Sequence, residues 1–102
     1  MLAAIGASTP SLTRQLAFDL TSIRVNCNAP GVVVTDFWSG MGKEQVEAYL
    51  KDRENKMLTQ KVAQPEAVAE AFLNVMRDMN TTGQVVHTNS GVIFDLIKAD
   101  AF

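Results

Sequence analysis

Residues 23–36 decide the fold, and they read Ile-Arg-Val-Asn-Cys-Asn-Ala-Pro-Gly-Val-Val-Val-Thr-Asp. Apolar and polar side chains alternate over the first six positions, which predicts a strand at residues 23–28. Pro30 has no backbone N–H and Gly31 permits a close backbone approach, so the two predict the end of this strand. Thr35 and Asp36 can cap or turn the segment that follows.

A helix is predicted on the N-terminal side of this strand. Leucines recur every four residues from Leu12 to Leu20 and form one apolar stripe. The stripe predicts a helix over residues 10–21, opened by Pro10 or Ser11. Residues 1–10 are small and weakly patterned, and we interpret them as an atypical leader.

The C-terminal side adds two helices and a second strand. We expect a loop at 37–42, a charged helix at 43–57, a helix from Pro65 to about Met79, a strand at 84–88 and some helical potential over 92–102. A strand, a helical crossover and another strand form a βαβ unit, so the two strands should be parallel. Two parallel strands alone make a poor sheet, because such sheets normally extend over several strands.

Composition narrows the class of protein. A chain of 102 residues with 47% apolar residues predicts one globular domain. The net charge of −2 argues against nucleic acid as the main partner. No apolar run reaches the roughly 18 residues of a membrane span, and residues 1–6 lack the basic start of a secretory signal. With the single cysteine Cys27 and no Cys/His cluster for a metal, a reducing, cytoplasmic setting is expected.

Several strings occur in a specific order and spacing. They are Leu-Thr-Arg-Gln-Leu-Ala-Phe-Asp-Leu at 12–20, Ile-Arg-Val-Asn at 23–26, Ala-Pro-Gly at 29–31 with a threonine five positions after the proline, Gln-Pro-Glu-Ala-Val-Ala at 64–69, Ala-Phe-Leu at 71–73 and Thr-Gly-Gln-Val-Val at 82–86. Through these strings, residues 12–91 resemble the C-terminal portion of the short-chain dehydrogenases/reductases. The resemblance implies an α/β fold that is an incomplete, C-terminal part of a doubly wound Rossmann-type parallel sheet, in the order α-β-α-α-β over one partial domain, residues 1–102.

The resemblance also implies a function and a cofactor. The family transfers a hydride between an alcohol and a carbonyl with NAD or NADP. By resemblance, Pro30 and Gly31 flank the nicotinamide, the backbone of Val33 reaches the carboxamide, and the Thr35 hydroxyl contacts the carboxamide or the pyrophosphate region. Open α/β sheets bind ligands at the carboxyl ends of their strands, which agrees with this placement.

A substrate-loop insertion occupies residues 37–64 in the same comparison. Phe37 and Trp38 would begin a mobile lid over the substrate. Two adjacent aromatic side chains in a loop can instead pack against a neighbouring surface, and the sequence leaves both interpretations open.

The departures from the family pattern concern the chemistry itself. The glycine-rich motif G-x-G-x-x-G is absent. Counting back from Leu12 places the family's Tyr-x-x-x-Lys pair at Leu2 and Gly6, which offer neither a hydroxyl proton nor an ammonium group. We therefore predict no catalytic residues, no turnover by this chain alone, and weak cofactor binding or none.

A second hypothesis is an interaction module. Helices like that at 10–21 and the helix–strand pair at 65–88 commonly build subunit interfaces in this family. The open edge of the strand at 23–28 could pair with a second copy, giving a homo-oligomer, or dock on another subunit of this family. A third hypothesis is a fragment, with a lost first half or a misassigned start and no separate role.

The other reactive side chains are expected to have ordinary structural roles. Tyr49 and Arg53 are four residues apart on a predicted helix and therefore share a face. His87 is expected to be a structural residue of a strand, and Cys27 to pack inertly. The glycosylation pattern at residues 80–82 is taken as chance.

Overall fold

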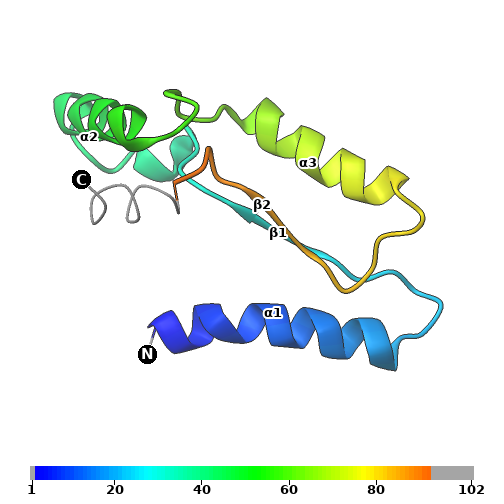
Figure 1. Ribbon diagram of the computed structural model, residues 1–102. Helices are drawn as coiled ribbons and strands as arrows, with labels where there is room; N and C mark the ends of the chain where they lie inside the picture. The colour runs from blue at the N-terminus through cyan, green and yellow to red at the C-terminus, as the bar shows by residue number, and fades with distance from the viewer. Residues whose placement is uncertain (1, 93–102) are drawn as a thin grey trace, which may run out of the picture. The chain divides into compact units, whose positions relative to one another are not determined.

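The computed structural model describes residues 2–92, and its elements follow the predicted order (Figure 1). They are α1 (Leu2–Asp19), β1 (Cys27–Pro30), the short 3-10 helix η1 (Asp36–Trp38), α2 (Lys43–Lys56), α3 (Pro65–Arg77) and β2 (Val85–Thr88). The α/β class is thus confirmed, as are the helices predicted from residues 43 and 65. The helical potential predicted over 92–102 lies outside the described residues, apart from Val92.

The two strands pair directly with each other as a two-stranded sheet. The Cys27 N–H donates to the Gln84 carbonyl at 2.9 Å, and the Gly31 N–H donates to the Thr88 carbonyl at 3.1 Å. In both bonds the acceptor residue follows the donor residue by the same number of positions, which holds for parallel strands and not for antiparallel ones. The predicted parallel pairing is therefore confirmed.

β1 is shorter at its start than the prediction of a strand over residues 23–28, which was wrong in its bounds. The Gly83 N–H still donates to the Val25 carbonyl at 2.7 Å, but side chains replace other bonds of the expected ladder there. The Val25 N–H donates to Thr82 Oγ1 at 3.1 Å, and Asn26 Oδ1 accepts from the Gln84 N–H at 3.1 Å. Because side-chain oxygens occupy these backbone donors, regular strand geometry begins only at residue 27.

Pro30 is the last residue of β1 and not a residue beyond it. Alternate residues of a strand point their N–H groups to opposite edges. Since the Cys27 and Gly31 N–H groups point to β2, the position of Pro30 faces the outer edge. A missing N–H costs no ladder bond at that edge, so proline fits the position.

α1 begins at Leu2, and the prediction that Pro10 or Ser11 opens this helix was wrong. Pro10 lies inside the helix and deprives the Gly6 carbonyl of its usual partner. The Gly6 position borders open space, so water can reach that carbonyl. Leucine and alanine between residues 2 and 7 favour a helix strongly enough to continue through this defect.

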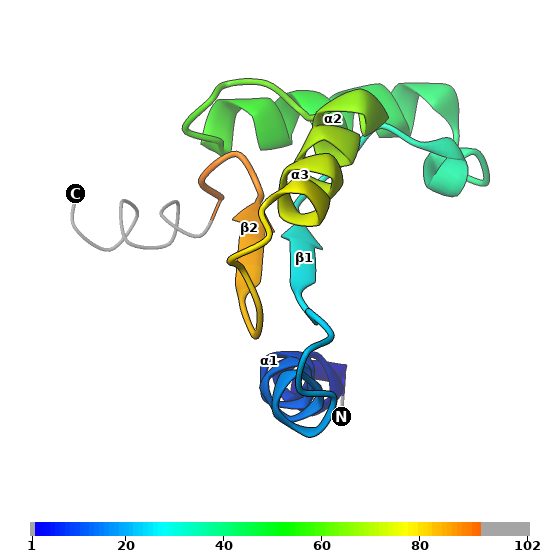
Figure 2. The ribbon, with the colours of Figure 1, turned by 90° about the vertical axis from the view of Figure 1, so that its right-hand side faces the viewer.

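The residues group into two compact units, of which the first comprises Met1–Ala29 and Glu70–His87. In this unit α1 and the part of α3 from Glu70 lie on opposite faces of the paired strands (Figures 1 and 2). A Cβ on Gly83 would lie 3.6 Å from the Ala17 side chain, so the segment before β2 passes within ordinary contact range of α1.

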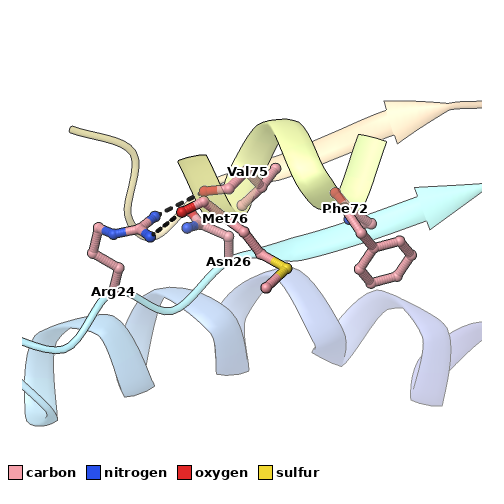
Figure 3. A pocket seen from close by; sticks show the side chains of 6 residues that line it. Arg24, Asn26, Phe72, Val75 and Met76 are labelled. Carbon is pink, nitrogen blue, oxygen red and sulfur yellow. Dashed lines mark hydrogen bonds between the residues drawn. The ribbon is translucent and has the colours of Figure 1, made fainter. Parts of the chain in front are cut away.

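Arg24 closes the C-terminal end of α3 within this first unit (Figure 3). Its guanidinium donates at 2.9 Å to the carbonyls of Val75, Met76 and Asp78 and at 3.3 Å to that of Thr81. The last carbonyls of a helix have no partner within the helix, and a cation also complements the negative end of its dipole. One side chain from the segment before β1 therefore fixes the turn that follows α3.

The second unit comprises Pro30–Ala69 and the residues from Thr88 onward. It holds Met57 at 3% and Val62 at 8% exposure, the apolar residues that are buried among those whose burial the structure describes. The Ser90 carbonyl accepts from the N–H groups of Leu58 and Thr59 at 3.0 and 3.4 Å. The turn after β2 therefore fixes the segment that follows α2.

Candidate functional site

The segment that leaves β1 runs tightly against the turn that leaves β2. A Cβ on Gly31 would lie 2.9 Å from Asn89 Cα and 3.0 Å from Asn89 Cβ. A side chain at position 31 would force one of the two main chains to move, so only glycine fits there. The close backbone approach predicted for Gly31 is confirmed, and the two closely packed main chains form a strip at this end of the strands.

Val33 presents one free backbone donor beside this strip. It forms a parallel bridge with Ala63, in which the Val34 N–H donates to the Ala63 carbonyl at 3.0 Å. In such a bridge the bridged residue's own N–H and C=O point the opposite way. The Val33 carbonyl accepts from Trp38 Nε1 at 2.9 Å, while the Val33 N–H meets no acceptor within residues 2–92.

Thr35 lies at the start of η1. Its Oγ1 accepts from the Phe37 N–H at 3.3 Å, so the hydroxyl caps the short helix. A hydroxyl that accepts one bond can still donate its proton outward, and Thr35 is exposed.

The two aromatic residues of the predicted lid have different environments. Phe37 is 81% exposed. The Trp38 ring is half-buried between Phe37 at 5.0 Å and Tyr49 at 5.2 Å, measured between ring centroids. Trp38 therefore packs within its own unit, whereas Phe37 remains free to contact another molecule.

A hollow of about 400 Å³ adjoins this loop. Its lining consists of Thr35, Asp36, Trp38, Ser39, Met41, Lys43, Val46 and Glu47. A volume of this size matches small-molecule sites, which combine apolar walls with a few polar groups. Sequence reasoning named only Thr35 and Trp38 here; the start of α2 at Lys43, directly after the loop, is the signal that could have added the others.

Several predicted side chains lie away from this strip. The Arg53 guanidinium lies over the Tyr49 ring, with its Cζ 5.6 Å from the ring centroid. This cation–π contact supports a structural role for the pair. His87 is exposed on β2, and Cys27 is half-buried with its sulfur 3.7 Å from the Asn28 carbonyl. None of the three meets an acid or base that would activate it within the described residues.

The expected Tyr-x-x-x-Lys positions are both on α1, where Leu2 and Gly6 occupy successive turns of the helix. Residues four apart share one helix face, so the spacing of the pair is present without its functional groups. Over residues 2–92 no cluster of His, Cys, Asp or Glu could hold a metal ion. In the same residues no helix has both the length and the apolar character needed to cross a membrane.

The family model for an SDR-like Rossmann domain matches residues 1–96. The chain therefore belongs to the short-chain dehydrogenase/reductase (SDR) family, as its motifs predicted. It is 39% identical to the short-chain dehydrogenase/reductase malC of Malbranchea aurantiaca over 80% of this chain and 31% of that protein. It is 41% identical to ATR9 of Stachybotrys chlorohalonatus over 86% of this chain and 34% of that protein.

Solved structures agree on the fold. A small-chain dehydrogenase in complex with NADPH superimposes with a TM-score of 0.86 at 29% identity, covering 90% of this chain and 42% of that one. The MalC reductase/Diels-Alderase from Malbranchea aurantiaca gives 0.81 at 36% identity, covering 86% of this chain and 34% of that one. The chain thus spans about a third of the length of the malC and ATR9 proteins.

The strip fits one part of a dinucleotide cofactor. A planar amide such as the nicotinamide carboxamide needs a backbone donor and room for its ring. The Val33 N–H supplies the donor, whereas the Asn89 backbone fills the space into which a side chain at position 31 would project. Nothing among these 102 residues matches the glycine-rich turn that holds a pyrophosphate. The residues present therefore offer a main-chain donor of the kind that a carboxamide needs, and no counterpart of that turn.

Proposed function

We propose that these residues form the nicotinamide wall and the substrate loop of an NAD(P)-dependent oxidoreductase that interconverts an alcohol and a carbonyl. The single observation that carries the proposal is the free Val33 N–H beside the backbone strip at Gly31. Membership of a family with an NADPH-bound structural neighbour supports the cofactor class. When bound, the cofactor supplies the hydride, and the protein orients it.

Each residue of the proposed wall has a defined task. Pro30 and Gly31 form the surface against which the nicotinamide ring lies, and the Val33 N–H donates to its carboxamide oxygen. Thr35 donates its hydroxyl proton to the carboxamide or to the pyrophosphate region. Phe37 contacts the substrate, which occupies the neighbouring 400 Å³ hollow.

We further propose that the 102-residue polypeptide alone does not catalyse the conversion of a substrate. Proton transfer to a carbonyl oxygen needs a positioned acid, and neither Leu2 nor Gly6 provides one. Without a pyrophosphate site, the wall retains only a small part of the cofactor's binding energy. We expect dissociation constants in the millimolar range for NADH and NADPH.

An NMR titration of the ¹⁵N-labelled chain tests both statements. NADH and NADPH should shift the amide signals of Gly31, Val33 and Thr35, whereas ADP-ribose, which lacks the nicotinamide, should not. Equal shifts with ADP-ribose, or no shift at Val33 at millimolar NADH, would contradict the proposed wall. Micromolar affinity, or oxidation of NADPH with a carbonyl substrate, would contradict the proposed lack of independent activity.

A second candidate function is an assembly module, in which a second copy of the chain or another SDR subunit covers the outer edge of β1. One observation favours it: Asn28, which lines a hollow of about 200 Å³ between the β1 segment and α3, has an Oδ1 that is buried without a hydrogen-bond partner in residues 2–92. Phe72 and Met76 line the same hollow and are 50% and 66% exposed (Figure 3). A second subunit that pairs with the edge and extends over the hollow would cover both exposed side chains.

Sedimentation velocity tests the assembly module. A two-fold dimer is the expected species, since such dimers are the commonest oligomers. Asn28→Asp places a charge at the proposed contact and should shift the chain to monomer. A well-folded monomer of the unaltered chain over the concentration range would remove this candidate.

A further inference from the structure

A column of side chains connects α2 to the residue that carries the proposed cofactor donor. Arg53 lies over the Tyr49 ring at 5.6 Å, and Tyr49 lies against the Trp38 ring at 5.2 Å. The Trp38 indole then donates to the Val33 carbonyl at 2.9 Å. All four residues belong to the second compact unit.

The indole bond is specific in a way that apolar packing is not. An indole N–H is a donor only, so it fixes the direction of the carbonyl that accepts it. Val33 points its carbonyl and its N–H to the same edge, away from Ala63. The two groups belong to adjacent peptide planes, so a bond that holds the carbonyl restrains the free N–H through the extended backbone of Val33 that joins the planes.

We propose that Trp38 is a positioning residue, whose indole N–H holds Val33 so that the Val33 N–H faces the nicotinamide carboxamide. The inference rests on the proposed function and deepens it. Tyr49 and Arg53 hold the indole plane in place, so an ordered substrate loop and an ordered cofactor donor occur together. Phe37, at 81% exposure, is left as the aromatic residue that faces the substrate.

A simpler role for Trp38 would be to anchor the loop by burying its ring. Trp38→Phe separates the two roles, because phenylalanine can keep the contact with Tyr49 but has no N–H. Phe37→Leu is the matched control, since it alters the neighbouring aromatic side chain and leaves the indole bond intact. Tyr49→Phe is a second control that keeps the ring and removes only its hydroxyl.

NMR on the ¹⁵N-labelled chain supplies the readout, because Trp38 is the only tryptophan and gives one indole signal. The indole proton should exchange at least tenfold more slowly than that of a free indole. In the absence of cofactor, Trp38→Phe should shift the Val33 amide signal and speed exchange at Val34, while the signals of α2 stay in place. Neither control should move the Val33 signal comparably.

With cofactor, Trp38→Phe should weaken the NADH-specific shift at Val33 by about fivefold, as expected for the loss of one net hydrogen bond. An indole proton that exchanges freely, or a Val33 amide unmoved in cofactor-free Trp38→Phe, would overturn the inference. A normal cofactor-free result with no NADH shift in the unaltered chain would instead remove the proposed function. The two failures are therefore distinguishable.

Discussion

Replacing Arg24 by alanine should remove a large part of the stability of the first compact unit. The bonds to Met76 and Asp78 are exposed, so water replaces them at little cost. The part-buried bonds reach Val75 at 2.9 Å and Thr81 at 3.3 Å. With about 2 kcal/mol for the shorter bond, about 0.5 for the longer one and about 0.5 for the helix dipole, the loss is about 3 kcal/mol.

A loss of that size is readily measured. It corresponds to a fall in Tm of more than about 10 °C for a domain of this length. Urea unfolding followed by circular dichroism measures the change in the free energy of unfolding. Trp38 fluorescence gives a second signal, because Trp38 belongs to the other unit. We expect the dichroism transition to shift further than the fluorescence transition in Arg24→Ala.

Arg24→Lys is the matched control. It keeps the positive charge near the helix end, but a single ammonium group cannot span the carbonyls that the guanidinium fork reaches. Lysine should therefore recover less than half of the loss. A destabilisation below about 1 kcal/mol in Arg24→Ala, or full recovery by lysine, would refute the reasoning.

Three further substitutions test other contacts. Gly31→Ala forces a Cβ to within 3.0 Å of the Asn89 backbone and should cost about 1–3 kcal/mol in urea unfolding; an unchanged midpoint would contradict the close approach. Met57→Ala removes a side chain that is 3% exposed and should cost about 2–4 kcal/mol, seen in the Trp38 fluorescence transition; a cost under about 1 kcal/mol would contradict its place in the core. The hydrogen bond from Thr81, with a smaller one from the Asn80 N–H, lowers the pKa of Asp78, so its stabilising contribution is present above the ordinary value of 3.8 and is lost as the pH falls through the lowered value. Asp78→Asn should therefore reduce the fall in Tm that thermal melts show between pH 5 and pH 2. A fall of unchanged size would contradict this role.

Local patterns were sufficient to predict the order of elements. The helix that starts at Pro65 follows directly from its proline, its apolar spacing and its position after a connector. The parallel pairing of β1 and β2 followed from the crossover between them. The helix depends on residues close together in the chain and the pairing on a general rule for strand connections, which is why sequence reasoning reached both.

The bounds of β1 depend on contacts that no local pattern contains. The alternation at residues 23–28 is a good strand pattern, yet Asn26 bonds residues near position 82 with its side chain. Polar positions in an alternating segment usually face water, so sequence reasoning assigned none of them a partner. The same holds for Arg24, whose bonds reach more than fifty residues along the chain.

The candidate site shows the same division between local and distant causes. Gly31 could be singled out because a glycine directly after a proline at the end of a strand indicates a turn or a close backbone approach. The direction of the Val33 N–H could not be predicted, because it depends on a bridge to Ala63 and an indole bond from Trp38. A main-chain donor carries no side-chain signature, so its direction is fixed only by what its neighbours bond. If the proposed function is correct, the pairing of residues 33 and 63 matters to cofactor contact as much as any side chain that faces the cofactor.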